Sequence, residues 1–74
     1  MKFEDFKYSW DKISYDGKKV KAVWLSDKIY INVDKYDKRS EFEVNLYYNR
    51  GLITHVPLKT IKDVTKNYWG DNNE

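Results

Sequence analysis

The residues that could carry acid–base or metal chemistry in this sequence are few and poorly grouped. His55 is the only histidine, so a histidine-rich metal site cannot be built, and a nucleophile–histidine–acid triad would have to use this one residue. It lies in segment 53–57, where alternation and Pro57 predict the outward face of an edge strand. We therefore expect a half-exposed strand histidine.

The carboxylates are no better placed for catalysis. Glu41 and Glu43 lie two apart on a predicted strand and face solvent, where burial cannot tune either group for proton transfer. Asp34, Asp37 and Glu41 surround a turn, but their spacing does not match a calcium-binding EF-hand loop. With no cysteine and no glycine-rich phosphate loop, the sequence predicts a protein that is not an enzyme and has no cofactor or metal.

What remains for function is surface. The predicted strand phases place ammonium groups and flat aromatic rings on one outward face, which holds Lys19, Lys21, Tyr30, Asn32, Asn45, Tyr47 and His55. The candidate binding residues within it are Lys19, Lys21, Tyr30, Tyr47 and His55. Readers of single-stranded nucleic acid use lysines on phosphates and rings on bases, so a nucleic-acid-binding module is one interpretation. Glutamates on the same face and a net charge of only +2 weaken it.

The alternative use of such a surface is contact with another protein. Aromatic residues make up 18% of the chain, more than a short core needs, and exposed rings suit interface anchors. The tyrosines expected to be partly exposed are Tyr8, Tyr30, Tyr36, Tyr47 and Tyr68. We therefore expect a non-enzymatic binding protein that acts by protein–protein contact, a compact regulator or inhibitor, and an edge strand near Pro57 that could also pair with a second copy.

Composition also indicates where in the cell the protein is found and the kind of organism it comes from. The chain has no cysteine, no apolar run of about 18 residues that could span a bilayer, and a polar N-terminal segment unlike a signal peptide. These features predict a cytoplasmic protein without membrane contact. Lys, Asn, Tyr and Ile are abundant, and their AT-rich codons indicate a low-GC bacterium or one of its phages.

Short alternating segments must position these residues. Asp16-Gly17 has the sequence of a type I′ turn and predicts a hairpin over residues 13–20. The following strand, 18–25, should turn Val20, Ala22 and Trp24 toward the core. A further strand over 28–33 should place Ile29, Ile31 and Val33 on one face, opposite Tyr30, Asn32 and Asp34.

The second half of the chain continues the pattern. A polar connection over 35–40 should lead to a strand over 41–48 that buries Phe42, Val44, Leu46 and Tyr48. Asn49-Arg50-Gly51 fits a hairpin loop with Asn or Gly in the left-handed position. The last clear strand, 52–58, should turn Leu52, Val56 and Leu58 inward and lie at a sheet edge because of Pro57.

The two ends allow alternatives. Phe3, Phe6, Trp10 and Ile13 recur at helical spacing, yet residues 6–10 also alternate, so we expect a short turn of helix that leads into a strand, with a bulge near residues 11–12. Residues 61–69 could form a helix capped by Thr60, or a 3₁₀ turn followed by a last strand.

Together these segments predict a mainly β, β-rich α+β domain. The expected architecture is a five-stranded antiparallel meander, curled or barrel-like in the manner of small SH3-like and OB folds, with a short terminal helix or 3₁₀ turn. One domain should cover residues 1–69, followed by a solvated tail over 70–74.

Overall fold

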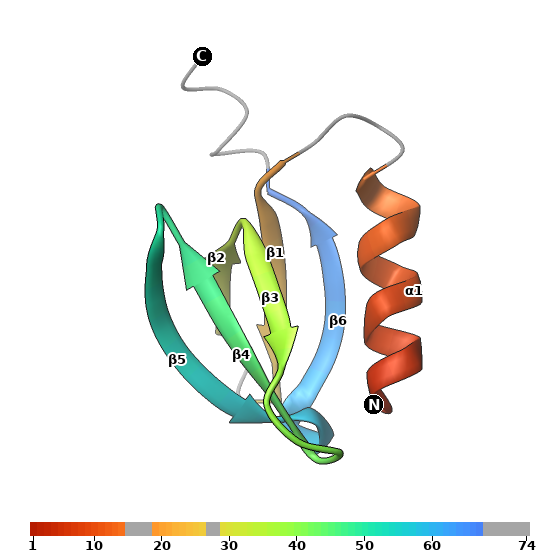
Figure 1. Ribbon diagram of the computed structural model, residues 1–74. Helices are drawn as coiled ribbons and strands as arrows, with labels where there is room; N and C mark the ends of the chain where they lie inside the picture. The colour runs from red at the N-terminus through yellow and green to blue at the C-terminus, as the bar shows by residue number, and fades with distance from the viewer. Residues whose placement is uncertain (15–18, 27–28, 68–74) are drawn as a thin grey trace.

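Two three-stranded antiparallel sheets and one helix build this chain, as seen in a computed structural model that describes residues 1–14, 19–26 and 29–67 (Figure 1). In chain order the elements are helix α1 (Phe3–Ser14), strands β1 (Lys21–Leu25), β2 (Tyr30–Val33), β3 (Lys35–Lys38), β4 (Glu43–Tyr48) and β5 (Gly51–Pro57), the 3₁₀ turn η1 (Leu58–Thr60) and strand β6 (Ile61–Lys66).

The sheets have the strand orders β2-β1-β6 and β3-β4-β5. Only Asp34 separates β2 from β3, so one bent segment contributes a strand to each sheet, and the Asp34 N–H donates to the carbonyl of Tyr47 at 2.9 Å. The mainly β, antiparallel prediction is confirmed. The five-stranded meander is wrong, because the described chain has six strands in two sheets, and no ladder joins these sheets into a closed barrel.

The core is aromatic at its helical side. Phe6 and Trp10 of α1 are 0% and 9% exposed, and both rings meet Tyr36 of β3 edge-on, at centroid distances of 4.8 and 4.9 Å. Residues of every strand except β3 complete the buried cluster, together with η1: Val23, Val33, Val44, Leu46, Val56, Leu58, Ile61 and Val64. The helix therefore covers an apolar surface that the two sheets leave open.

The N-terminal prediction of a short turn and then a strand is wrong. The helical spacing of Phe3, Phe6, Trp10 and Ile13 turns all four side chains toward the core, while Tyr8 is 69% exposed. The helix runs to Ser14, so there is no bulge near residues 11–12, and Ile13 is not the first arm of a hairpin. The Asp16-Gly17 turn lies outside the described residues.

The faces of β1 are the reverse of the prediction for Val23 and Trp24, although Ala22 is buried as expected, at 3% exposed. Val23 faces the core with its cross-strand neighbours Ile31 and Val64, so Lys21 shares that face, and Trp24 lies on the other one. The Lys21 side chain is only 1% exposed, with its Nζ 5.2 Å from the centre of the Trp10 ring. The strand therefore keeps its two-residue period, but the face that carries Lys21 is the one that points to the core, where Trp10 covers the ammonium group.

The second sheet agrees better with the sequence. Val44 and Leu46 are fully buried as predicted, but Lys35–Lys38, expected as a connection, pairs with β4 as a strand. Asn49 takes a left-handed conformation in the hairpin turn, as expected, and so does Arg50 (φ 54° and 70°). Tyr48, predicted inward, is 40% exposed at the end of its strand.

The expected edge position of Pro57 is confirmed, since β5 is the outer strand of its sheet. Leu52, predicted inward, is 56% exposed because Ile53 is an extra residue opposite the Leu46–Tyr47 step. This bulge reverses the faces of the strand on its N-terminal side.

At the C-terminal end, the 3₁₀ turn followed by a strand is the correct alternative, and the helix over 61–69 is wrong. Ile61 and Val64 are buried where β6 pairs with β1. Tyr68 and the predicted tail lie outside the described residues. In the part of the chain that the structure describes, no helix is long and apolar enough to cross a membrane.

Candidate docking groove

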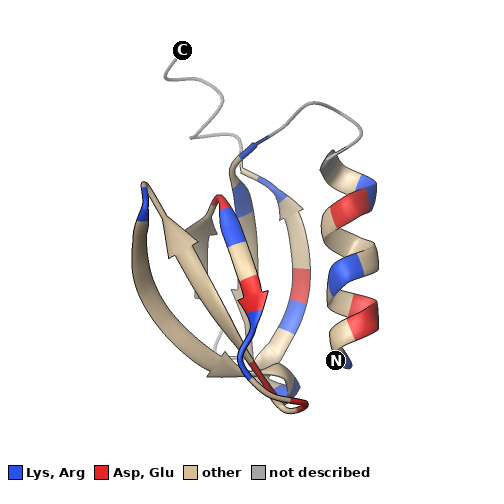
Figure 2. Ribbon diagram, viewed as in Figure 1, with Lys and Arg blue, Asp and Glu red and all other residues tan. Residues whose placement is uncertain are grey.

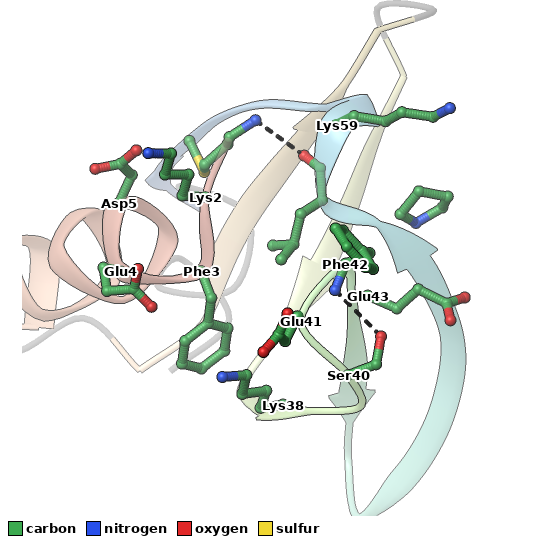
Figure 3. Close-up of a pocket in the computed structure, with 13 residues that line it drawn as sticks. Lys2, Phe3, Glu4, Asp5, Lys38, Ser40, Glu41, Phe42, Glu43 and Lys59 are labelled. Atoms are coloured by element: carbon green, nitrogen blue, oxygen red, sulfur yellow. Dashed lines mark hydrogen bonds between the residues drawn. The ribbon is translucent and has the colours of Figure 1, made fainter.

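A hollow of the described surface lies where three distant segments meet. The first turn of α1, the β3–β4 connection and η1 surround a groove of about 880 Å³ (Figure 3). Its lining residues are Met1, Lys2, Phe3, Glu4, Asp5, Lys38, Ser40, Glu41, Phe42, Glu43, Pro57, Leu58 and Lys59. We call this hollow the docking groove.

Phe42 is the most exposed large apolar residue of the described chain, at 76%. Its main chain is nevertheless held on both sides: its N–H donates to Ser40 Oγ at 3.2 Å, and its carbonyl accepts the Leu58 N–H at 2.8 Å. The N–H groups of Arg39 and Ser40 both donate to the carbonyl of Glu43, which fixes the turn before it. A rigid frame therefore presents the ring to solvent.

The opposite wall of the groove is Phe3. Its ring is partly buried and packs edge-on against Tyr36, with centroids 6.0 Å apart and planes at 61°. The Nζ of Lys38 lies 5.4 Å from the centre of the Phe3 ring. Burial, with a smaller contribution from Asp11, raises the pKa of Tyr36, so this supporting residue stays neutral.

Charges of both signs line the groove. Figure 2 shows basic and acidic positions close together along the chain at the end of β3 and in the β3–β4 connection. Glu43 lies 3.8 Å from Arg39 Nε and 3.8 Å from His55 Nε2. Within the described residues, the other rim charges, which are Lys2, Lys38, Lys59, Glu4, Asp5 and Glu41, have no ion pair. They are therefore available to a partner.

Comparison with known proteins does not identify a function for this groove. No protein-family model, curated protein or solved structure matches this chain. In the part of the chain that is described, no group of three or more His, Cys, Asp or Glu residues could hold a metal ion. The groove must be interpreted from its own geometry.

The residues predicted from the sequence as one binding surface are divided between the two sheets. Lys19 is exposed just before β1, but Lys21 is buried. Tyr30 is half-buried, and its ring centre lies 4.8 Å from that of Trp24, whose Nε1 donates to Thr65 Oγ1 at 2.7 Å. These side chains do not form an open face with Tyr47 and His55.

Tyr47 and His55 lie on the outer face of the other sheet. The Tyr47 hydroxyl donates to Asp37 Oδ2 at 2.8 Å, and Asn45 Nδ2 donates to Asp37 Oδ1 at 2.7 Å. These two hydrogen bonds lower the pKa of Asp37, and the bond to Asp37 raises the pKa of Tyr47. The Tyr47 hydroxyl is therefore already bonded to the Asp37 carboxylate and is not open to a ligand.

Sequence reasoning missed the docking groove because it treated Phe42 as the first inward residue of a strand. The strand begins one residue later, at Glu43. The local signal was Ser40, whose side chain can accept an N–H two residues on and so favours a turn over a strand.

Proposed function

We propose that this protein is a non-enzymatic binding protein that acts by docking onto a segment of another protein through the groove around Phe42. One observation carries the proposal: a phenylalanine ring that is 76% exposed stands on a main chain held by hydrogen bonds on both sides. Large apolar rings so exposed on a fixed frame are typical of interface anchors.

The composition of the groove supports the same conclusion. Protein interfaces combine an apolar centre with a polar rim. Here Phe3, Phe42, Pro57 and Leu58 supply the apolar centre, and lysines and carboxylates surround it. A volume of about 880 Å³ fits a few side chains of a partner segment, which suits a small regulator or inhibitor.

The nucleic-acid alternative has less support. It relied on Lys21, which is buried, and on Tyr47, whose hydroxyl donates to Asp37. The Asp37 carboxylate beside Tyr47 would repel a phosphate group. We expect the fluorescence anisotropy of labelled single- and double-stranded oligonucleotides to stay unchanged when this protein is added. Binding whose affinity falls steeply with salt and is abolished by Tyr47→Ala would restore this alternative.

The docking proposal is tested with one groove variant and one matched control. Tyr8 is a suitable control because its ring is 69% exposed on α1 but does not line the groove. A partner is captured from a lysate of the source organism, produced as a pure protein, and titrated calorimetrically against wild type, Phe42→Ala and Tyr8→Ala.

We expect Phe42→Ala to weaken binding at least about tenfold, as loss of an interface anchor does, and Tyr8→Ala to change it by less than about twofold. Equal affinities of the wild type and Phe42→Ala for every captured partner would overturn the proposed site.

A further inference from the structure

Strand β3 is an outer strand of its sheet and pairs with β4 on one side only (Figure 1). The Arg39 N–H donates to the carbonyl of Glu43 at 3.1 Å, at the end of the β3–β4 ladder. Because main-chain direction alternates along an antiparallel pair, the N–H and C=O groups of Asp37 also face β4, whereas those of Tyr36 and Lys38 point away from it. We call this side of β3 the β3 edge.

The main-chain groups of the β3 edge are open to a partner. Among the described residues, no hydrogen bond from outside the β3–β4 ladder reaches the main chain of Tyr36 or Lys38. Helix α1 contacts this strand through side chains, since the rings of Phe3, Phe6 and Trp10 meet that of Tyr36. The β3 edge therefore offers donors and acceptors at the regular spacing that a further strand uses.

The outer edge of β5, in the same sheet, is protected. Pro57 has no N–H, and its carbonyl accepts Thr60 Oγ1 at 2.7 Å. The carbonyl of His55 accepts Thr54 Oγ1 at 3.2 Å, and the extra residue Ile53 breaks the regular spacing of the strand. Strand β3 has neither a proline nor a bulge, and its residues pair regularly with β4. The two edges of this sheet are therefore not equivalent.

Charged side chains select what can pair with the β3 edge. On the outer face of the sheet, Lys35 begins β3 and Arg39 follows it, with Asp37 between them (Figure 2). The Asp37 carboxylate already accepts two hydrogen bonds from side chains of β4, and Arg39 has only an exposed ion pair with Glu43. A second copy would bring the same cations to the edge, whereas carboxylates on a partner strand would be attracted.

The other face of the β3 edge leads into the docking groove. Lys38 lines the groove, with its Nζ 5.4 Å from the centre of the Phe3 ring. Glu4 and Glu41 also line it, so further carboxylates on this side would be repelled. An apolar side chain that entered from β3 would meet the rings of Phe3 and Phe42 (Figure 3).

The side chains of a strand alternate between its two faces. Building on the proposed docking function, we propose that the partner segment is extended, adds to the β3 edge as a further strand, and alternates acidic with apolar residues. Its acidic side chains lie beside the cations of the outer face, and its apolar side chains enter the docking groove. A helix would leave the main-chain groups of Tyr36 and Lys38 without partners, which costs free energy wherever it buries them.

The test uses two displayed libraries of segments of about eight residues as probes. In the first, Asp or Glu alternates with varied apolar residues, and in the second, Lys or Arg replaces the acidic residues. Peptides selected on the whole wild-type chain are resynthesised with one N-methyl group at each position in turn, which removes a single N–H donor.

The peptides are titrated against wild type, Phe42→Ala and Lys35→Glu. The matched controls are Tyr8→Ala and Lys62→Glu, because both side chains are exposed and neither lies on β3 or lines the docking groove. Amide hydrogen exchange of the wild-type chain is measured with and without the peptide that binds most tightly.

We expect binders from the acidic library. N-methylation at alternate positions should weaken binding at least about tenfold, and methylation between them by less than about twofold, because every second N–H of an added strand faces β3. Phe42→Ala should weaken binding at least about tenfold and Lys35→Glu at least about threefold, whereas neither control should change it by more than about twofold. The amides of Tyr36 and Lys38 should exchange at least about tenfold more slowly, while that of His55 keeps its rate.

The other outcomes separate the added strand from the proposed function. Phe42-dependent binders without the alternation, and without protection of the Tyr36 and Lys38 amides, would overturn the added strand and leave the docking groove in place. Alternation and protection without an effect of Phe42→Ala would support pairing with β3 and count against the proposed function.

Equal or tighter binding by peptides of the basic library would overturn the acidic partner. A lack of binders in both libraries would overturn the added strand, while calorimetry with the captured partner would still decide whether Phe42 is an anchor.

Discussion

The same substitution at two phenylalanines should destabilise the fold to very different extents. Phe6 is fully buried and packs against Tyr36 at 4.8 Å, whereas Phe42 is 76% exposed. The periodicity of the sequence alone would place both rings in the core. Alanine at each position therefore separates the structure from the simplest interpretation of the sequence.

The expected magnitudes follow from burial. Removing a buried phenylalanine side chain costs about 3–5 kcal/mol of unfolding free energy, because apolar burial is lost and a cavity remains. Full burial of such a side chain is worth about 1.5–3 kcal/mol, and Phe42 buries only about a quarter of its surface, so Phe42→Ala should cost about 0.4–0.7 kcal/mol. A domain of this size has a total stability of about 4–11 kcal/mol, so only the Phe6 change threatens folding.

The assay is urea unfolding followed by tryptophan fluorescence, since Trp10 lies beside Phe6 in the core. If Phe6→Ala does not fold, Phe6→Leu keeps most of the volume and should lose about 0.5–1.5 kcal/mol with the aromatic contacts. A loss above about 2 kcal/mol for Phe42→Ala would show that this ring is packed in solution and would refute the reasoning.

Three further predictions concern the turn between β4 and β5, the hydrogen bonds of Asp37 and the outer edge of β5. Arg50→Gly should stabilise the chain by up to about 1 kcal/mol in thermal unfolding, because Arg50 has φ 70° and glycine adopts that conformation without strain. The control Arg39→Gly should give no gain in stability. A loss of stability in Arg50→Gly would contradict this prediction. Asp37 has a lowered pKa in the folded chain, so its contribution is present above its unfolded pKa of about 3.9 and is lost as pH falls through the folded value. Carboxyl NMR titration should show that Tyr47→Phe raises the pKa of Asp37, and an unchanged value would refute the role of this bond. Pro57→Val restores an N–H on β5, an outer strand of its sheet, and should increase concentration-dependent association in sedimentation. No increase would mean that the Ile53 bulge alone blocks pairing.

Much of the fold could be predicted from the sequence because β periodicity is a local property. The alternation of Val44 and Leu46 with polar neighbours fixed the faces of β4 correctly. Leu52 and Trp24 could not be placed in the same way. A one-residue bulge turns Leu52 to the outer face of β5. Burial of Lys21 puts Trp24 on the face of β1 that lies away from the core. Both depend on tertiary contacts, which a local pattern does not contain.

The N-terminal helix was underestimated for a related reason. Residues 6–10 satisfy helical and strand periods at once, and only the position of Tyr36 decides between them. A helix turns Phe6 and Trp10 toward this ring and leaves Tyr8 in solvent, whereas a strand would place Tyr8 on the same face as both. Since Tyr36 belongs to a segment that the sequence predicted as a loop, the partner that selects the helix was itself hidden.

The docking groove could not have been predicted from any local pattern, because no single segment contains it. Residues 1–5, 38–43 and 57–59 form its walls, and they meet only because η1 brings Leu58 beside the start of α1 and beside Phe42. The Leu58 N–H donates to the Phe42 carbonyl, and the Met1 ammonium donates to the Leu58 carbonyl, so these two hydrogen bonds join the three segments that form the groove.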